Sequence, residues 1–323
     1  MRKALLALLV LVLLAGGGAW WAWEQWRAPG PLGQPTAIVI PRGSSSEAIG
    51  AALVEQGAIR DARIFAAAAW VTREAGPLRA GEYLFPAHGS VAQVLDVLRT
   101  ARPVQRRLTI PEGLTAKQIV ALIDAAPGLT GDTPALDEGG VLPETYSYQY
   151  GDTRAALARR ATQAMATVLE RLWKERAEGL PLASPREALV LASIVERETG
   201  QPAERPHVAG VFINRLRRGM PLQSDPTVAY AAADGAPLER ALTRADLDRD
   251  HPFNTYRVRG LPPGPIASPG EESLKAVLRP MDTDDIYFVA DGTGGHAFAR
   301  TLEEHNRNVA RWRQIERQRA NPQ

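Results

Sequence analysis

The chain has 323 residues, of which 45% are hydrophobic and 23% charged, so it is long enough for two packed units and too apolar for wholesale disorder. The 38 basic and 36 acidic residues leave a net charge of only +2, which gives no basic field of the kind that nucleic acid requires. The absence of cysteine excludes disulfides, thiolate metal sites, a cysteine nucleophile and a lipidated N-terminal cysteine.

Residues 1–26 are predicted to form a cytoplasmic tip and a transmembrane anchor. Arg2 and Lys3 precede a charge-free stretch at 4–23, which as a helix would span about 30 Å, the thickness of a bilayer core. Positive charge before the span favours a cytoplasmic N-terminus, with the tryptophans of residues 20–26 at the far interface. The alternative is a cleaved signal peptide with Leu5–Leu14 as its apolar core. Under either interpretation the remaining chain is exported.

After a Pro- and Gly-rich linker at 27–36, an internal repeat predicts a small α+β module. Three phrases begin with an apolar residue and a proline, continue with Ser or Thr, and end in an amphipathic pattern typical of a capped helix. The copies of the phrase are 45 and then 25 residues apart, and this uneven spacing argues against a solenoid. Proline followed by a capped helix is also simply a common way for a helix to begin. Capping boxes are expected at Ser44/Glu47, Ser90/Gln93 and Thr115/Gln118.

A helix predicted from Pro185 to about Thr199, with Ser184 as its N-cap, carries the residue best suited to catalysis. On a helical wheel Glu198 falls within the apolar stripe, whereas Glu196 falls on the opposite, solvent-facing side. Desolvation and the negative end of the helix dipole would both raise the pKa of Glu198, as a general acid requires. The alternative is a buried structural glutamate that is paired with an arginine.

The spacing of these two glutamates also bears on the reaction class. On a helix they diverge by about 200°, which argues against a glycosidase that uses both carboxylates and favours a single catalytic carboxylate. The sequence contains no His-Glu-x-x-His pattern, phosphate-binding glycine loop or G-x-S-x-G elbow. Metal hydrolysis, nucleotide chemistry and serine hydrolysis therefore lose support, and we expect no metal and no cofactor.

Polar residues at the ends of later elements complete the set of candidates. A helix is predicted at 206–218, and another begins at Ser224 or Asp225, so Asp225 is either a cap or a catalytic group. Rigid loops are expected at 254–256 and 260–266. A hairpin at 286–298 precedes a final helix after Thr301, and His296 on that hairpin is expected to be structural.

Several phrases in this region resemble those of one known family. They are Leu191-Ala192-Ser193-Ile194-Val195-Glu196-Arg197-Glu198-Thr199, Val211-Phe212-Ile213-Asn214-Arg215-Leu216, Leu222-Gln223-Ser224-Asp225-Pro226-Thr227-Val228, Asn254-Thr255-Tyr256, Gly260-Leu261-Pro262-Pro263-Gly264-Pro265-Ile266 and Tyr287-Phe288-Val289-Ala290-Asp291-Gly292. In this order they resemble the endolytic murein transglycosylase family (YceG-like, MltG), over nearly the whole chain.

The resemblance implies an α+β fold with an N-terminal transmembrane helix, a LysM-like module at 37–108 and a mixed α+β catalytic domain at 109–323. The catalytic glutamate of the family corresponds to Glu198, and Arg197 stands where members commonly have lysine. Weaker candidates for substrate contacts are Gln223, Asp225, Tyr230, Asn254 and Tyr256.

The activity that the resemblance implies is cleavage of the β-1,4 bond between N-acetylmuramic acid and N-acetylglucosamine within glycan strands, which leaves 1,6-anhydro ends. It also implies a single-pass protein of the bacterial inner membrane with a periplasmic catalytic domain, working beside the peptidoglycan polymerases. The alternatives are a non-catalytic peptidoglycan-binding membrane protein and a glycan hydrolase that uses water.

Overall fold

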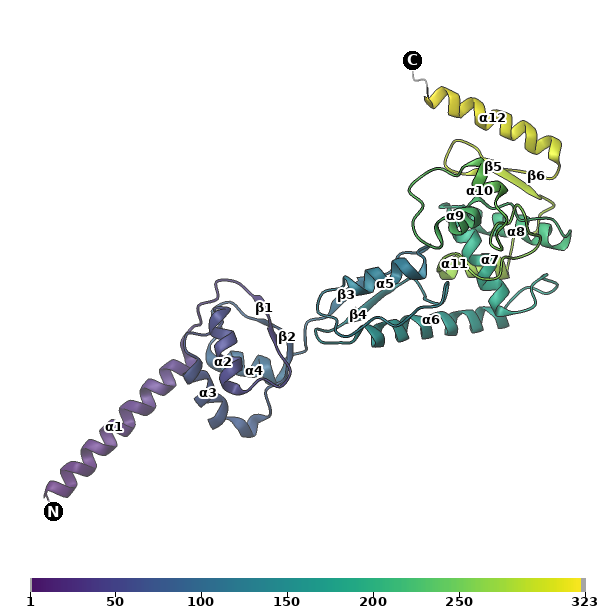
Figure 1. The fold of residues 1–323 in the computed structure, drawn as a ribbon. Coiled ribbons are helices and arrows are strands. Elements are labelled where there is room, and N and C mark those ends of the chain that lie inside the picture. Colours follow the sequence, from purple (N-terminus) through teal and green to yellow (C-terminus); the bar gives the residue numbers. More distant parts are fainter. Residues whose placement is uncertain (1, 321–323) are drawn as a thin grey trace. The chain divides into compact units, whose positions relative to one another are not determined.

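The computed structural model describes residues 2–320 and divides the chain into two units (Figure 1). The first contains the chain up to Arg106 together with Pro127–Leu129 and Ser147–Asp152, and the second contains the rest. Met1 and residues 321–323, which belong to the predicted anchor and the predicted catalytic domain, lie outside the described residues. Within residues 2–320 the strands form three separate two-stranded sheets among many helices. The predicted mixture of helix and strand is confirmed, and the LysM-like character of the first unit stays a prediction.

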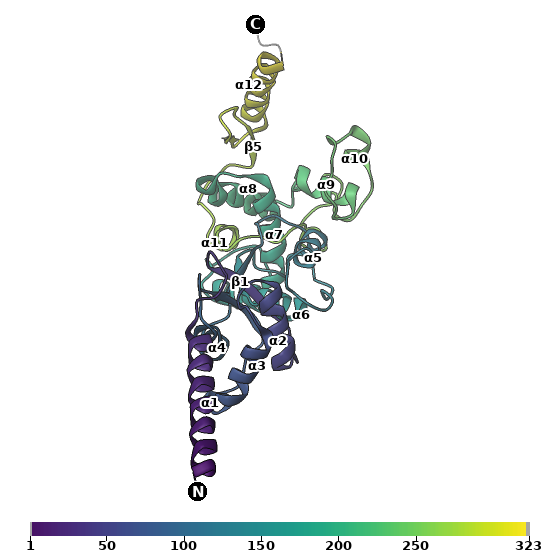
Figure 2. The same ribbon diagram turned by 90° about the vertical axis from the view of Figure 1, so that its left-hand side faces the viewer.

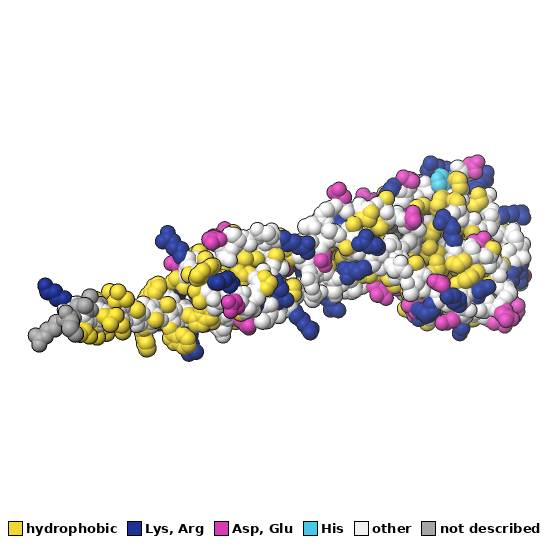
Figure 3. Space-filling model, turned by 90° about the horizontal axis from the view of Figure 1, so that it is seen from below, with side chains coloured by type: hydrophobic (Ala, Val, Ile, Leu, Met, Phe, Trp, Pro, Cys, Tyr) yellow, Lys and Arg dark blue, Asp and Glu magenta, His cyan; other side chains and the backbone are white. Residues whose placement is uncertain are grey.

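The first unit begins with the long helix α1 (Arg2–Arg27). Hydrophobic side chains cover it, and its leucines from Leu5 to Leu14 are largely exposed (Figure 3). Its segment Leu8–Arg27 is long and apolar enough to cross a membrane. A membrane span and a signal sequence share these properties, so both interpretations of the segment agree with the helix.

The rest of the first unit is a small α+β core. Strand β1 (Thr36–Ile40) pairs antiparallel with β2 (Gly81–Phe85), so that Ile38 lies opposite Tyr83. The alternation of these strands turns Ile38, Ile40, Tyr83 and Phe85 to one face, where they are buried in the core. The helical elements are α2 (Ser46–Glu55), α3 (Ala62–Val71), the 3₁₀ turn η1 (Arg73–Ala75) and α4 (Val91–Thr100).

The three repeated phrases form β1–α2, β2–α4 and β3–α5, where β3 is Arg106–Thr109 and α5 is Ala116–Asp124. Complete capping boxes occur at Ser90/Gln93 and Thr115/Gln118, as predicted. The prediction for Ser44/Glu47 is wrong by one residue, because Ser45 is the N-cap and accepts a hydrogen bond from the Ala48 amide. Helix α3, which the sequence analysis did not identify, lies between the first two phrases and accounts for their wider spacing.

The second unit is built around α7 (Pro185–Glu198), which has Ser184 as N-cap and a proline in its first turn, as predicted. Every residue from Ala188 to Val195 is buried, because α6, α8, α9 and α11 pack around the helix (Figure 2). The core includes Leu191, Ile194, Val208, Phe212 and Leu274. The elements before and around α7 are β4 (Thr145–Tyr148), α6 (Arg154–Lys174), η2 (Pro202–Glu204), α8 (Arg205–Arg217), α9 (Asp225–Ala233), α10 (Arg244–Asp248) and α11 (Glu271–Leu278).

The chain ends with the predicted hairpin and helix. Strands β5 (Tyr287–Ala290) and β6 (His296–Ala299) pair antiparallel, and α12 (Leu302–Ala320) packs on them. The hairpin also contacts α8, which joins it to the core around α7. The C-terminal end of α7 and this hairpin therefore belong to one packed structure.

Candidate active site

Glu198 is the last residue of α7, at the point where the buried helix reaches a cleft of about 390 Å³. Thr199, which follows it, is in an extended conformation and ends the helix. The polar groups that line the cleft come from α7, α8, the chain before α9, the start of α9, the loop after α10 and the hairpin. They include Glu198, Arg215, Gln223, Asp225, Tyr256 and His296.

The surroundings of Glu198 change its proton affinity. The pKa of Glu198 is raised to about 7, mainly by burial and in smaller part by the nearby charge of Asp225, while Ser224 and Arg215 act in the opposite direction. The Ser224 hydroxyl is buried without a partner within hydrogen-bond distance, and its interaction with the Glu198 carboxyl lowers the pKa of that group. A carboxyl with a pKa near 7 is present in both forms at neutral pH, and it can therefore donate a proton and take one back.

Asp225 belongs to the cleft rather than to the cap of its helix. Ser224 is the N-cap residue of α9 and Asp225 is the first helical residue. The Asp225 carboxylate accepts a hydrogen bond of 2.7 Å from the Tyr256 hydroxyl, and burial together with this bond raises the pKa of Tyr256. The structure thus joins two predicted substrate-contact residues in a pair beside Glu198.

Gln223 has a strained backbone at the edge of the same cleft. Its φ is +50°, a left-handed conformation that costs a non-glycine residue about 1–3 kcal/mol and is concentrated at functional sites. The Gln223 amide donates to the Thr255 carbonyl at 3.0 Å, which holds the chain in this conformation. The Gln223 side chain oxygen also lies 3.4 Å from Arg215 Nη1.

A buried cluster of hydroxyl groups fastens the loop of Tyr256 to the start of α9. Thr255 Oγ1 accepts from the Ser224 amide and lies 2.9 Å from Thr227 Oγ1. Asn254, which the sequence analysis proposed as a substrate contact, is fully buried and donates to the carbonyls of Leu247 and Arg249. Its own side chain oxygen accepts from the Tyr256 amide. We therefore assign Asn254 to positioning Tyr256.

Arg215 is a site residue that the sequence analysis missed. It is 6% exposed, and its Nε and Nη1 donate to the carbonyls of Ile286 and Leu222 at 2.7 Å. Its guanidinium group thereby connects α8 to β5 and to the chain before α9. A signal was present, because Arg215 lies four residues after Val211 on the buried side of α8, where a charged residue needs a partner.

Two histidines of the hairpin region also line the cleft. The His296 ring, expected to be structural, has its Nδ1 2.8 Å from Glu204 Oε2, and its backbone amide donates to the other Glu204 oxygen. These contacts fix the ring at the edge of the cleft. Burial and the charge of Arg215 lower the pKa of His305, which favours its neutral form.

Tyr230 lies in a neighbouring cleft of about 280 Å³, which Arg197 and Pro226 also line. Its hydroxyl donates to Glu138 Oε2 at 3.2 Å. Arg197 is exposed, as predicted, and donates to the Gly113 carbonyl. Arg197 precedes Glu198 and Pro226 follows Asp225, so residues that are neighbours along the chain line the two clefts.

The prediction for Glu196 is wrong. Its side chain is only 5% exposed, forms an ion pair of 3.0 Å with Arg205 and accepts from the Gly270 amide at 2.9 Å. A Cβ at position 270 would overlap Glu112, which pairs with the same Arg205. A helical wheel gives only the directions in which side chains leave one helix. It could not show that neighbouring segments cover both faces of α7. The buried glutamate paired with an arginine is thus Glu196 and not Glu198.

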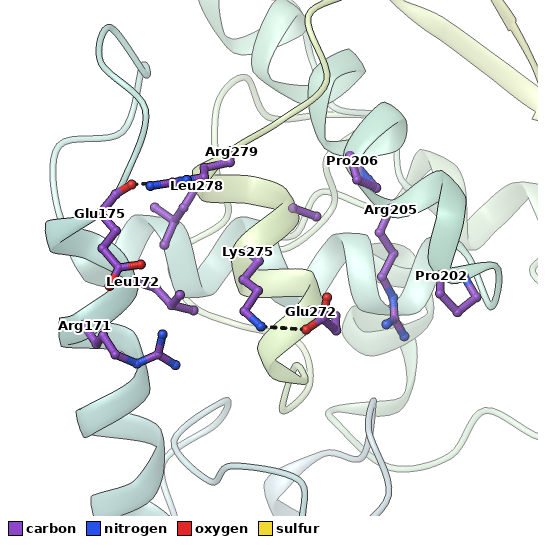
Figure 4. A pocket seen from close by; sticks show the side chains of 11 residues that line it. Arg171, Leu172, Glu175, Pro202, Arg205, Pro206, Glu272, Lys275, Leu278 and Arg279 are labelled. Atoms are coloured by element: carbon purple, nitrogen blue, oxygen red, sulfur yellow. Dashed lines mark hydrogen bonds and ion pairs between the residues drawn. The ribbon is translucent and has the colours of Figure 1, made fainter.

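A further hollow lies between α6, α8 and α11 (Figure 4). Most of its charged side chains already have partners, since Lys275 pairs with Glu272 at 2.8 Å, Arg279 donates to the backbone carbonyl of Glu175, and Arg171 pairs with Glu271. Glu198 does not line it, so we do not place the chemistry there. Among residues 2–320, no group of three or more His, Asp or Glu side chains is arranged to hold a metal ion.

Comparisons with known proteins agree with the resemblance seen in the sequence. The model of the YceG-like family matches residues 38–311. The chain is 39% identical to an endolytic murein transglycosylase of Bacillus subtilis over 175 residues, which cover 53% of this chain and 46% of that protein. It is 31% identical to an endolytic murein transglycosylase of Streptococcus pneumoniae over an alignment of 320 residues, covering 84% of this chain and 57% of that protein.

The chain thus spans about half the length of the curated relatives it matches. The crystal structure of a YceG-like protein from Listeria monocytogenes is 29% identical and superposes with a TM-score of 0.50, covering 85% of this chain and 99% of that one. Because the family model matches most of the chain, from the first strand to the last helix, the protein belongs to the YceG-like family.

Proposed function

We propose that the protein is a membrane-anchored lytic transglycosylase that cleaves the β-1,4 bond between N-acetylmuramic acid and N-acetylglucosamine within peptidoglycan strands. The observation that carries this proposal is the carboxyl of Glu198, whose pKa is raised to about 7 in a cleft. The names of the curated relatives support the substrate class.

In the first step, the protonated Glu198 donates its proton to the bridging oxygen. The bond from C1 of the muramoyl residue to that oxygen breaks, and the departing N-acetylglucosamine keeps the proton as its hydroxyl. The positive charge that develops on C1 is that of an oxocarbenium ion. Glu198 is left as a carboxylate.

In the second step, this carboxylate takes the proton of the muramoyl C6 hydroxyl. The C6 oxygen bonds to C1 and closes the 1,6-anhydro ring, so no water is consumed and Glu198 returns to its acid form. A single group serves both steps only if its two forms are close in free energy near the working pH, as a pKa of about 7 provides.

Asp225 gives a specific reason to test a second function. The cleft contains this second carboxylate, and a glycan hydrolase uses a pair of carboxyl groups, one as the acid and the other as base or nucleophile. We favour the transglycosylase because Asp225 is held by the Tyr256 hydroxyl at 2.7 Å and raises the pKa of Glu198. Product mass separates the two reactions, since an anhydro end lacks one water.

Two clefts lined by neighbouring residues of the chain support cleavage within a strand rather than at its end. Glu198 lines one cleft and Arg197 lines the other, and we propose that a glycan strand cleaved beside Glu198 extends into the second cleft. We propose that Tyr230 contacts the glycan in the second cleft.

We also propose that the cleaved strands are nascent ones, which the protein trims or ends beside the peptidoglycan polymerases.

Replacing Glu198 by Gln should abolish cleavage while the fold is retained. Loss of a general acid–base group lowers the rate by about 10²–10⁴-fold, and here one group acts twice. Digestion of purified glycan strands, with mass analysis of the fragments, measures the loss.

The matched control for Glu198→Gln is Glu196→Gln on the same helix. It leaves Arg205 with one partner fewer and should lower the free energy of unfolding by about 1–3 kcal/mol, while the folded fraction keeps its activity. A folded but inactive Glu196→Gln beside an active Glu198→Gln would contradict the assignment.

The rate should depend on pH in a direction that follows from the raised pKa of Glu198. The first step needs the acid form, so kcat/KM should fall as pH rises through about 7. Asp225→Asn removes the negative charge that favours the acid form, and the falling limb should then move to lower pH. A limb that stays in place in this variant would show that Asp225 does not act on the reacting carboxyl.

The anchor can be tested by topology. Arg2 and Lys3 before the charge-free span predict that the C-terminal bulk lies outside the cytoplasm. A reporter enzyme that works only outside the cytoplasm, fused after Gln323, should be active, and activity of a cytoplasmic reporter there would refute the topology. A mature protein that lacks the tryptophans of residues 20–26 would instead show that the span is a cleaved signal.

A further inference from the structure

Helix α3 contacts α1 in the first unit (Figures 1 and 2). A groove of about 570 Å³ is lined by the C-terminal part of α1 and by α3. Its walls are apolar and come from two sources. Helix α1 supplies Trp21, Trp23 and Trp26, and α3 supplies Ile64, Ala68 and Val71.

The exposed side of α3 is unusually apolar. One side of the helix packs Phe65 and Ala69 into the core of the unit, while Trp70 and Val71 at its end are each 68% exposed. No charged residue occurs in α3 after Arg63. Large apolar side chains that gather at the surface beside a groove mark a site of contact with another molecule or with a membrane.

The position of the groove next to the predicted membrane span points to lipid as the molecule that covers it. Trp21 and Trp23 are 56% and 54% exposed and follow directly on the charge-free span, where an interfacial belt of tryptophan is expected. Because α3 contacts this part of α1, its exposed end lies at the same depth as the belt. Arg63 lines the groove, and the Arg73 guanidinium stacks on the Trp70 ring at 4.7 Å. Cationic groups beside exposed tryptophan suit a layer of lipid phosphates.

We infer that α3 lies in the lipid–water interface and that the groove between α1 and α3 is filled by acyl chains of bilayer phospholipid. This inference rests on the proposed membrane anchoring by α1. The membrane then holds the first unit at two elements instead of one, which limits the orientations that the unit can adopt. A single spanning helix leaves rotation about its axis free, and the second contact removes that freedom.

The chain has no cysteine, so a nitroxide label can be placed at one site without further changes. We would label three single variants of the full-length protein in vesicles of phosphatidylethanolamine and phosphatidylglycerol. Val71→Cys reports on α3, and Leu11→Cys reports on the anchor. Leu84→Cys is the matched control, since Leu84 is apolar and 57% exposed but lies on β2 and does not line the groove. Collisions with oxygen, which dissolves in the bilayer, are compared with collisions with a water-soluble nickel chelate.

The inference predicts that labels at positions 11 and 71 collide more often with oxygen than with the nickel chelate. The label at position 84 should collide more often with the chelate. If the label at position 71 collides mainly with the chelate, as at position 84, while the label at position 11 collides mainly with oxygen, the inference is wrong and the proposed membrane anchoring by α1 is retained. Protection of position 71 from both reagents would indicate a protein partner and would also overturn it. If position 11 is open to the chelate, the proposed anchor fails, and the inference fails with it.

A second measurement needs no label. Lipids brominated along the acyl chain should quench part of the tryptophan fluorescence of the unmodified protein, and Trp70→Phe should reduce the quenched part. An unchanged quenched part in this variant would contradict the placement of α3.

Discussion

The desolvation of one carboxyl group, that of the half-buried Glu198, is the constraint on which the site depends. An ionised carboxylate loses solvation when it leaves water, and a second negative charge nearby adds repulsion, so both effects favour the acid form. Glu198 experiences both, because α7 ends inside the packed second unit and Asp225 begins α9 beside it. The Ser224 hydroxyl and, to a smaller extent, the charge of Arg215 oppose these effects and lower the pKa. The balance between desolvation, repulsion, one hydroxyl group and one buried cation sets the chemistry.

The surrounding structure maintains this balance by fixing the groups that face Glu198. Arg215 is held by two carbonyl groups, Asp225 by the Tyr256 hydroxyl, and the loop of Tyr256 by Asn254 and Thr255. Such a network is costly if any member is unsatisfied, because buried polar groups without partners destabilise the fold. The strained backbone of Gln223 belongs to the same assembly. Much of what makes Glu198 reactive is therefore supplied by residues that do not themselves transfer protons.

The sequence predicted the caps and faces of the main helix well, but it predicted poorly which of its side chains are buried by other elements. The cap at Ser184 and the position of Glu198 on the apolar side of α7 follow from residues that are neighbours along the chain. Glu196 was misplaced because Arg205 of α8 and the residue before α11, which cover it, lie outside α7 and no helical wheel contains them. Arg215 was missed for the same reason, since its partners are carbonyl groups from other segments. Asn254 was found as a polar loop residue, but only its buried contacts show that it positions Tyr256.

The central claim is that the fold raises the pKa of a single carboxyl to the value that two opposite proton transfers require. The most direct test is to follow the side chain carboxyl carbon of Glu198 by NMR in protein labelled with ¹³C at glutamate, with the Glu198→Gln variant identifying the signal. The account predicts a titration midpoint near 7, well above the ordinary glutamate value of about 4.3. A midpoint near that ordinary value would show that the cleft does not stabilise the acid form, and the account would be wrong.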